Sequence, residues 1–225
     1  MTAAIEAINL CKIYKLGALE IEVIKNITMT IEKGDFVSIM GPSGSGKSTF
    51  LYLAGGLDKP TSGNIMINGK ELSLMNDRDE SRMRRRDIGF VFQFYNLLPN
   101  LNVEENILLP ALLDGKKGSG YQGRLAELLD IVGLTERSHH TPRELSGGEQ
   151  QRTAIARALI NNPDIILADE PTGNLDTKSG TEILKLLRKI NHEKGHTIVM
   201  VTHSTEAASF SNRTIFMKDG RLWTQ

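Results

Sequence analysis

The sequence has one cysteine, few aromatic residues and no excess of charge of either sign. Because Cys11 has no second cysteine to pair with, an internal disulfide is excluded, which favours a reducing compartment such as the cytosol. Lys and Arg together number 27, as do Asp and Glu, so no net field attracts a nucleic acid or an anionic bilayer. We therefore expect no nucleic-acid partner.

Long apolar runs are also missing from the sequence. The longest, residues 107–113, is far shorter than the roughly 20 residues that span a bilayer, and Pro110 interrupts it. The first residues lack the apolar stretch of a secretory signal. The sequence therefore predicts a cytoplasmic protein, and any work at a membrane would require another subunit as its anchor.

Strand-like and helical segments alternate along the chain. Between the β-branched runs lie helical patterns, such as residues 181–190, which place Ile183, Leu187 and Ile190 on one face. This alternation predicts an α/β fold with a largely parallel sheet. The expected strands are residues 4–10, 36–40, 64–68, 88–92, 165–168, 197–202 and 214–218.

Two parts of the chain depart from this alternation. In the first part, strand-like segments follow one another closely with turns at 32–35 and 68–69, which predicts an added antiparallel β layer. From about residue 94 the strand pattern gives way to helical patterns, such as those at 123–132 and 150–161. We interpret residues 94–162 as a helical subdomain inserted into one domain that spans residues 1–225.

The strongest motif is GPSGSGKST at residues 41–49, between an apolar strand and a helical segment. Its spacing fits G-x-x-x-x-G-K-[ST], a loop whose glycines let backbone N–H groups point at phosphate oxygens. Lys47 would neutralise the terminal phosphates and Ser48 would bind Mg²⁺. The alternative, a Gly/Ser-rich loop that matches by accident, is disfavoured by this placement. The expected phosphate-binding residues are Gly41, Ser43, Gly44, Ser45, Gly46, Lys47, Ser48 and Thr49.

Polar residues follow two other apolar strands. Asp169 and Glu170 end the run at 165–170, where Asp169 would hold the water shell of Mg²⁺ and Glu170 would act as the general base for an attacking water. His203 follows the strand at 197–202 and would sense the transferring phosphoryl group. Taken alone, an Asp-Glu pair after a strand is more often a solvated loop, and a histidine there an ordinary polar terminus.

A further motif, LSGGEQ at residues 145–150, leads into a helical segment. Together with the phosphate loop, Gln93, the ILADE strand, Asp176 and His203, it makes the chain resemble the ABC (ATP-binding cassette) family from end to end. The resemblance implies a P-loop NTPase of the ABC ATPase type, with a RecA-like core, an antiparallel β subdomain and an inserted helical subdomain. It also implies a homodimer in the ATP-bound state, in which two copies of the chain hold two ATP molecules between them.

The resemblance assigns roles to single residues. Tyr14 matches the aromatic residue that stacks on adenine, with Val23 as its apolar neighbour. Gln93 matches the glutamine that approaches Mg²⁺ and the attacking water, and Asp176 matches the aspartate that communicates across the dimer. The implied catalytic set is Glu170, His203 and Gln93; the Mg²⁺ set is Ser48, Gln93 and Asp169; and the contacts to the ATP of the other copy are Ser146, Gly147, Gly148 and Glu149.

The residues that flank these motifs look most like the ATPases of lipoprotein release and macrolide export. The resemblance implies a peripheral subunit on the inner face of the cell membrane that uses ATP and Mg²⁺ to power an ABC transporter or a related membrane machine, in export or extraction. An integral membrane permease would dock near residues 94–106, with Tyr95, Leu97 and Leu98 near the contact.

Three other readings of the sequence compete with this one. A soluble ABC ATPase of DNA maintenance is disfavoured because the chain has no room for a long coiled-coil insertion. A kinase or GTPase outside the family is disfavoured by LSGGEQ and by the absence of an N-K-x-D motif for guanine. A regulatory ATPase of a cell-envelope complex stays open beside the transporter.

Overall fold

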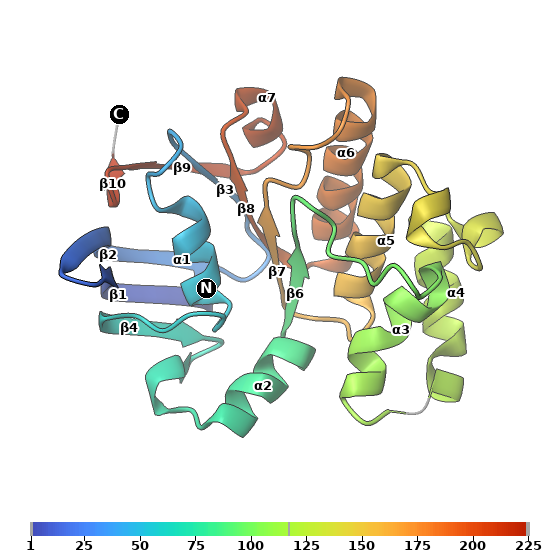
Figure 1. The fold of residues 1–225 in the computed structure, drawn as a ribbon, viewed down its shortest axis with the longest axis horizontal. Coiled ribbons are helices and arrows are strands. Elements are labelled where there is room, and N and C mark those ends of the chain that lie inside the picture. The colour runs from blue at the N-terminus through green and yellow to red at the C-terminus, as the bar shows by residue number, and fades with distance from the viewer. Residues whose placement is uncertain (1, 117, 224–225) are drawn as a thin grey trace.

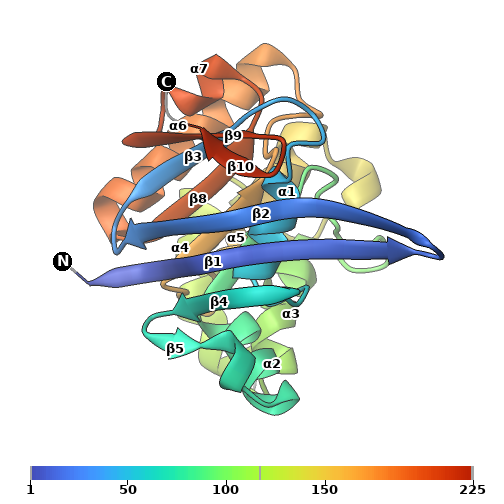
Figure 2. The ribbon, with the colours of Figure 1, turned by 90° about the vertical axis from the view of Figure 1, so that its left-hand side faces the viewer.

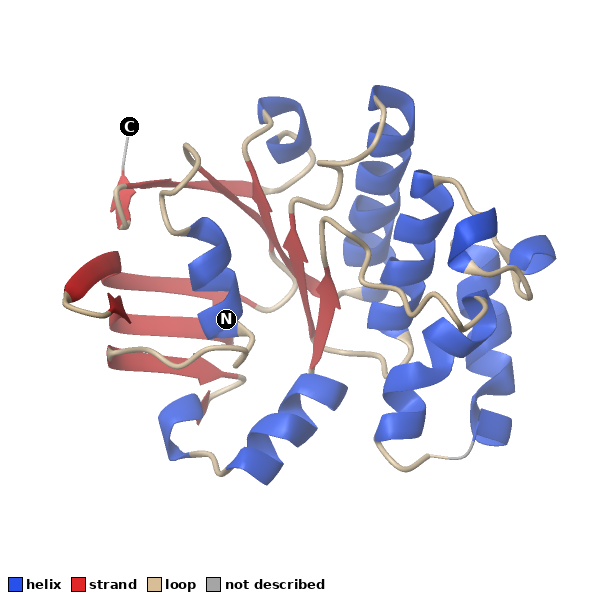
Figure 3. Ribbon diagram, viewed as in Figure 1, coloured by secondary structure: helices blue, strands red, loops and turns tan. Residues whose placement is uncertain are grey.

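The chain builds two sheets, one antiparallel and one mostly parallel, with helices around them (Figure 1, Figure 3). The computed structural model describes residues 2–116 and 118–223. Within these ranges no helix is long and apolar enough to cross a membrane. The predicted α/β architecture, with its antiparallel layer and its helical insertion, is confirmed.

The antiparallel sheet has the order β2(Leu19–Glu32), β1(Ala3–Leu16), β4(Ser62–Ile67) and β5(Lys70–Glu71). Residues 19–32 are not among the expected strands, yet β2 occupies the whole segment and pairs along the length of β1. Alternate residues near its end, including Ile27 and Ile31, are fully buried, so this half of β2 has one apolar face. The β1–β2 hairpin extends beyond the other strands of this sheet (Figure 2).

The parallel sheet places its strand ends at one edge. Its order is β10(Arg221–Trp223), β9(Arg213–Lys218), β3(Phe36–Met40), β8(Thr197–Thr202), β7(Ile165–Asp169) and β6(Ile88–Val91), with only β10 antiparallel. All residues of β3, β7 and β8 are buried, as expected for strands covered on both faces. Because β3, β6, β7 and β8 run in the same direction, the segments that carry the phosphate loop, Gln93, Glu170 and His203 leave from the same edge of the sheet.

Helices cover both faces of the parallel sheet. The helix α1(Lys47–Ala54) lies between the two sheets (Figure 1), and its Phe50, Leu51 and Leu53 are fully buried there. The helix α2(Asp77–Arg86) follows β5 and the short η1(Leu72–Leu74). On the opposite face, α6(Thr177–Lys194) packs its apolar stripe on the sheet, and α7(Thr205–Ala208) follows β8.

The segment between β6 and β7 is helical, as expected for residues 94–162. It contains α3(Val103–Leu113), α4(Gln122–Ile131) and α5(Gly147–Leu159), joined by the short η2(Gly118–Tyr121), η3(Thr135–Arg137) and η4(Pro142–Glu144). A loop precedes α3, and the fully buried Asn106 organises it, because its amide bonds Leu98, Leu101 and Asn102. This loop connects β6 of the parallel sheet to the helical segment.

Candidate functional site

The phosphate loop has a backbone that only glycine permits at two positions. A β-carbon on Gly41 would lie 2.0 Å from the carbonyl oxygen of Met217, and one on Gly46 would lie 2.7 Å from that of Val23. Gly46 has φ +95° and is the N-cap of α1, with no side chain that caps the helix. The first N–H groups of α1 therefore have no capping acceptor within the loop, which suits an anion.

Lys47 is the cation of this loop. It is 7% exposed, and its Nζ donates to the carbonyl oxygens of Gly41 and Pro42, at 2.9 Å in each case. An ammonium group has three hydrogens, so these two bonds leave one for a further acceptor. Beside it, the hydroxyl of Ser45 is buried with no hydrogen-bond partner among the described residues. Both groups fit a bound phosphate chain.

Ser48 and Asp169 bring two oxygen ligands together behind the loop. The hydroxyl of Ser48 donates to Oδ1 of Asp169 at 2.8 Å, and the phenol of Tyr52 donates to Oδ2 at 2.8 Å. Burial and the Asp169 carboxylate raise the pKa of Tyr52 to about 12, so the phenol stays a donor. No group of three or more His, Cys, Asp or Glu in the described residues could hold a metal alone. One carboxylate and one hydroxyl instead fit Mg²⁺ that takes its other ligands from phosphate and water.

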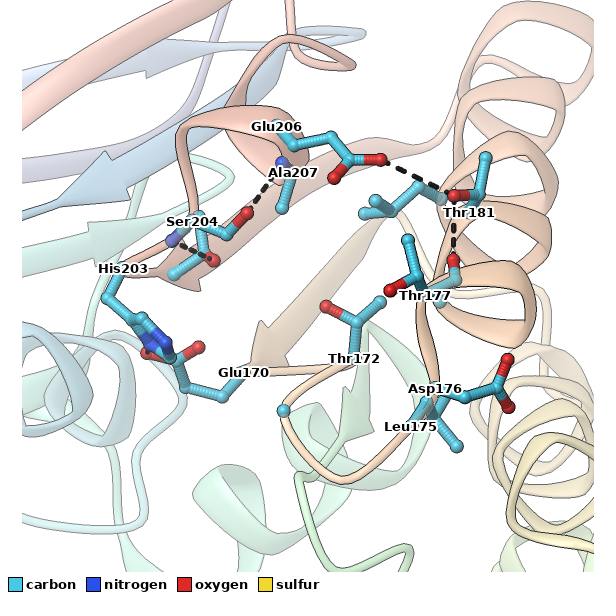
Figure 4. A pocket seen from close by; sticks show the side chains of 14 residues that line it. Glu170, Thr172, Leu175, Asp176, Thr177, Thr181, His203, Ser204, Glu206 and Ala207 are labelled. Atoms are coloured by element: carbon cyan, nitrogen blue, oxygen red, sulfur yellow. Dashed lines mark hydrogen bonds and ion pairs between the residues drawn. The ribbon is translucent and has the colours of Figure 1, made fainter.

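Glu170 and His203 lie side by side at the ends of β7 and β8 (Figure 4). Oε1 of Glu170 and Nδ1 of His203 are 2.9 Å apart, and the carboxyl side chain is 17% exposed against 72% for the imidazole. Glu170 has φ +46°, a conformation that costs free energy in a residue with a β-carbon and is concentrated at functional sites. Its backbone is held there by bonds to Val201 and Gly173.

A cleft of about 730 Å³ unites most of the predicted residues. Asp169 lies behind Ser48 rather than in the lining, and Tyr14 is also outside the lining. The phenol of Tyr14 donates to Asp58 at 2.6 Å, a contact that the sequence motifs do not predict. The cleft is lined by Val23, Ser43, Gly44, Ser45, Gly46, Lys47, Ser48, Thr49, Gln93, Glu170 and His203.

Gln93 lines the cleft, but its side chain hydrogen-bonds to another loop. Its Nε2 donates to Oδ1 of Asn174 at 3.3 Å, while the amide of Asn174 donates to the carbonyl oxygen of Gln93 at 2.9 Å. A β-carbon on Gly173 would lie 2.8 Å from the same Nε2. The loop after β6 is therefore clamped to the segment that contains Asp176, a contact between residues that are too far apart in sequence for a local pattern to reveal.

The signature segment, residues 145–150, lies away from the cleft in the same chain. Ser146 and Glu149 form a capping box at the start of α5, in which Oε2 of Glu149 accepts from the backbone N–H and from the hydroxyl of Ser146, both at 2.8 Å. These bonds lower the pKa of Glu149. Gly147 lies against the phenol of Tyr95, and Gly148 lies against Ser179. None of the signature residues lines the cleft.

Asp176 lies near the signature segment. Its carboxylate caps α6 by accepting from the backbone N–H of Ser179 at 3.0 Å, and the side chain and backbone N–H of Ser179 together lower its pKa. Ser179 also neighbours Gly148, so the first turn of α6 contacts both the carboxylate of Asp176 and the signature segment. A hollow of about 210 Å³ is lined by Asp176 together with Glu170 and His203 (Figure 4).

Fold and site together define a P-loop nucleoside triphosphatase, in which a phosphate loop, a carboxylate pair and a histidine meet at the edge of a parallel sheet. The sequence profile of the ABC transporter family matches residues 24–173. The chain belongs to the ABC transporter family, as an ATP-binding and ATP-hydrolysing subunit.

Individual relatives match almost the whole chain. An uncharacterised ABC transporter ATP-binding protein of Thermotoga maritima is 50% identical over 99% of this chain and 94% of its own length. The ATP-binding cassette MJ0796, solved as a post-hydrolysis dimer bound to ADP and Pi, has a TM-score of 0.90 and 46% identity, covering 98% of this chain and 97% of that one. CbiO1 of Clostridium perfringens, part of the ABC transporter complex cbiONQ, has a TM-score of 0.89 at 28% identity, covering 100% and 88%.

Proposed function

We propose that the chain acts as one ATPase domain that binds MgATP in the cleft. The glycine amides and Lys47 would hold the phosphates, and Ser48 and Asp169 would hold Mg²⁺, which supplies positive charge beside the phosphates. Tyr14 would contact the adenine from the β1–β2 hairpin, with Val23 as its apolar neighbour. The single observation that supports this assignment best is the buried Lys47, whose Nζ has one hydrogen left for a phosphate.

Glu170 is proposed as the general base for the attacking water. Its carboxylate lines the cleft at the ends of β7 and β8, and the bond to His203 orients it. His203 and Gln93 would complete the catalytic set by contacting the phosphoryl group and the water. The contact between Gln93 and Asn174 supports a further role for Gln93, which would link the cleft and the loop before α3 to the segment that contains Asp176.

The active form is proposed to be a homodimer that encloses two ATP molecules. The signature segment lies outside the chain's own cleft, which is expected if Ser146, Gly147, Gly148 and Glu149 contact the ATP of the other copy. Asp176, beside the signature segment, would communicate across the interface. The dimeric structures of MJ0796, at 46% and 47% identity, support this arrangement.

Glu170→Gln tests the base and the dimer together. The amide keeps the size of the side chain and its hydrogen bonding but cannot accept a proton, so turnover should fall by at least about 10²-fold. Since ATP then persists, the variant should elute as a dimer with MgATP and as a monomer with ADP on a sizing column. A variant that hydrolyses ATP normally would refute the base, and one that stays monomeric in saturating ATP would refute the dimer.

The driven partner is proposed to be an integral membrane permease, with the ATPase on the inner face of the membrane in export or extraction. A hollow of about 270 Å³ between the core and the helical segment would take a short permease helix. Its lining is largely apolar, including Phe92, Leu109 and Leu113, and also contains Arg84 and Arg85. In the adjoining loop, Phe94 and Leu98 are exposed, while Tyr95 and Leu97 are half-buried.

Two matched substitutions test this docking surface. Leu113, in the hollow, is 66% exposed, and Leu16, on the β1–β2 hairpin, is 65% exposed. Leu113→Asp should abolish co-purification with the membrane permease without lowering the ATPase activity of the isolated subunit, because it adds a charge to an apolar contact. Leu16→Asp should change neither. Equal effects of the two substitutions on permease binding would contradict this location.

A further inference from the structure

Tyr14 is held in a fixed orientation by two side chains outside the cleft. Its phenol donates to Oδ2 of Asp58 at 2.6 Å, and Nζ of Lys12 lies over its ring, 4.7 Å from the centroid. The ring is 37% exposed. One face of the ring is thus taken by a cation and its polar end by a carboxylate, so a planar group can stack only on the opposite face.

Asp58 is itself held by several donors. Its Oδ1 accepts from Nζ of Lys12 at 2.6 Å and from the backbone N–H of Lys59 at 2.7 Å, and Lys12 also donates to the carbonyl oxygen of Lys59 at 2.7 Å. Burial opposes ionisation, but the bonds from Lys12 and Tyr14 hold the pKa of Asp58 below its usual range. Both carboxylate oxygens are therefore occupied, and the group is a rigid acceptor for the phenol.

The cluster of Lys12, Tyr14 and Asp58 connects the strand that would contact the base to the segment that follows the phosphate loop and α1. Tyr14 belongs to β1, whereas Asp58 follows α1, the helix whose first turn carries Lys47 and Ser48. The backbone N–H of Ile13 also bonds the hydroxyl of Thr61 at 2.9 Å, so the strand is attached to the segment after α1 at more than one point. An exposed ion pair on a hairpin would contribute little. Here the side chains of Lys12 and Asp58 are only 12% and 29% exposed.

We propose that Asp58 and Lys12 are positioning residues that hold the ring of Tyr14 as a platform for the base of the nucleotide. They thereby set the preference of the site for a nucleoside triphosphate over a phosphate chain without a base. The inference rests on the proposed function, in which Tyr14 contacts adenine. Asp58 and Lys12, which lie outside the cleft, would then contribute only to the part of the ATP affinity that comes from the base.

The test compares two probes, MgATP and inorganic tripolyphosphate with Mg²⁺, by calorimetry on the full chain. Asp58→Ala should weaken ATP binding by about ten-fold, within the range that stacking one base on an aromatic ring contributes. Tripolyphosphate binding should stay unchanged, because the phosphate loop is untouched. Tyr14→Phe keeps the ring but loses the bond to Asp58, and it should shift ATP affinity in the same direction.

A matched control lies on the same hairpin. Glu20 pairs with Lys15 at 2.9 Å, and both side chains are exposed, so Glu20→Ala removes an ion pair that does not contact Tyr14. This variant should bind ATP as the unmodified protein does. If Glu20→Ala weakened ATP binding as much as Asp58→Ala, the effect would belong to the hairpin as a whole and the proposal would be overturned.

The remaining outcomes separate this inference from the function on which it rests. If Tyr14→Ala loses ATP affinity and Asp58→Ala does not, the platform stands and the positioning role is refuted. If Asp58→Ala weakens both probes equally, Asp58 acts through the fold and the proposal fails. If Tyr14→Ala leaves ATP affinity unchanged, the platform and the inference fail together, while tripolyphosphate binding still reports whether the phosphate loop binds phosphate.

Discussion

The helices α1 and α5 both have glycine and serine at or next to their N-caps, yet their N-termini are prepared for an anion in different ways. At α1 the N-cap is Gly46, no side chain caps the helix, and the first turn has no acidic residue. At α5 the N-cap is Ser146, which forms a capping box with Glu149 in the first turn. The N-terminus of α1 lacks an acceptor, whereas that of α5 already has one from its own chain.

Under the proposed function, this difference would give one chain a strong and a conditional phosphate site. The phosphate loop adds the buried cation Lys47, and no carboxylate of its own would have to be displaced by a phosphate. At the signature segment, the hydroxyl of Ser146 donates to a carboxylate that a phosphate would have to replace. Arg137, 3.7 Å from Glu149, reduces the local negative charge only in part. We expect the first site to bind ATP in a single chain and the second to contribute only in the closed dimer.

The largest effect is expected from Lys47→Ala, which removes the cation from the phosphate loop. Loss of one partner of a buried charge pair is costly, so ATP affinity should fall by about 100-fold or more, and turnover should fall with it. Calorimetry with MgATP measures the affinity, and thermal unfolding without nucleotide checks that the fold persists. Unchanged ATP affinity would mean that the phosphate loop does not depend on Lys47, and the contrast between α1 and α5 would then fail.

Ser146→Arg should separate the two sites. The long side chain replaces the N-cap of α5 and blocks the signature segment, so ATPase turnover should be lost while ATP binding to the isolated subunit stays nearly intact. Calorimetry gives the ATP affinity, and a steady-state phosphate assay on the same preparation gives the ATPase turnover. If binding and turnover declined together, both segments would belong to one site within one chain.

The sequence predicted the residues that line the cleft better than it predicted what holds them. Lys47, Glu170 and His203 follow apolar strands, and the ends of parallel strands meet at one edge, so a linear motif was enough to bring them together. The pairs Gln93 with Asn174 and Tyr14 with Asp58 join residues from distant segments. No periodicity or spacing encodes such contacts, because they depend on tertiary packing.

Two features of the sequence predict more of the structure than the periodicity of the apolar residues alone. The spacing of Ser146 and Glu149 is that of a capping box, which predicts that α5 begins at the signature segment rather than at residue 150. The alternation of Ile27, Met29 and Ile31 is that of a half-buried strand. The first four residues of β2, Leu19–Glu22, are all exposed, so the alternation does not extend along the whole strand.

The smallest effect is expected from Glu149→Gln, which sharpens the comparison by making the signature segment more like the phosphate loop. The bonds from Ser146 lower the pKa of Glu149, so the carboxylate is charged at neutral pH and would repel the phosphates of an ATP bound to the other copy. The amide removes that charge and can still accept from the backbone of Ser146. In a Glu170→Gln background, the ATP-bound dimer should tighten by about three-fold at low salt, as removal of one partly screened like charge predicts. The gain should shrink as salt is added.

Glu144 provides the control, because it forms the same kind of capping box with Thr141 outside the signature segment. Glu144→Gln should leave the dimer affinity unchanged in analytical ultracentrifugation. A weaker dimer in Glu149→Gln would mean that the carboxylate contributes more by capping α5 than it costs by its charge, and the contrast between the two helices would then lie in their caps alone.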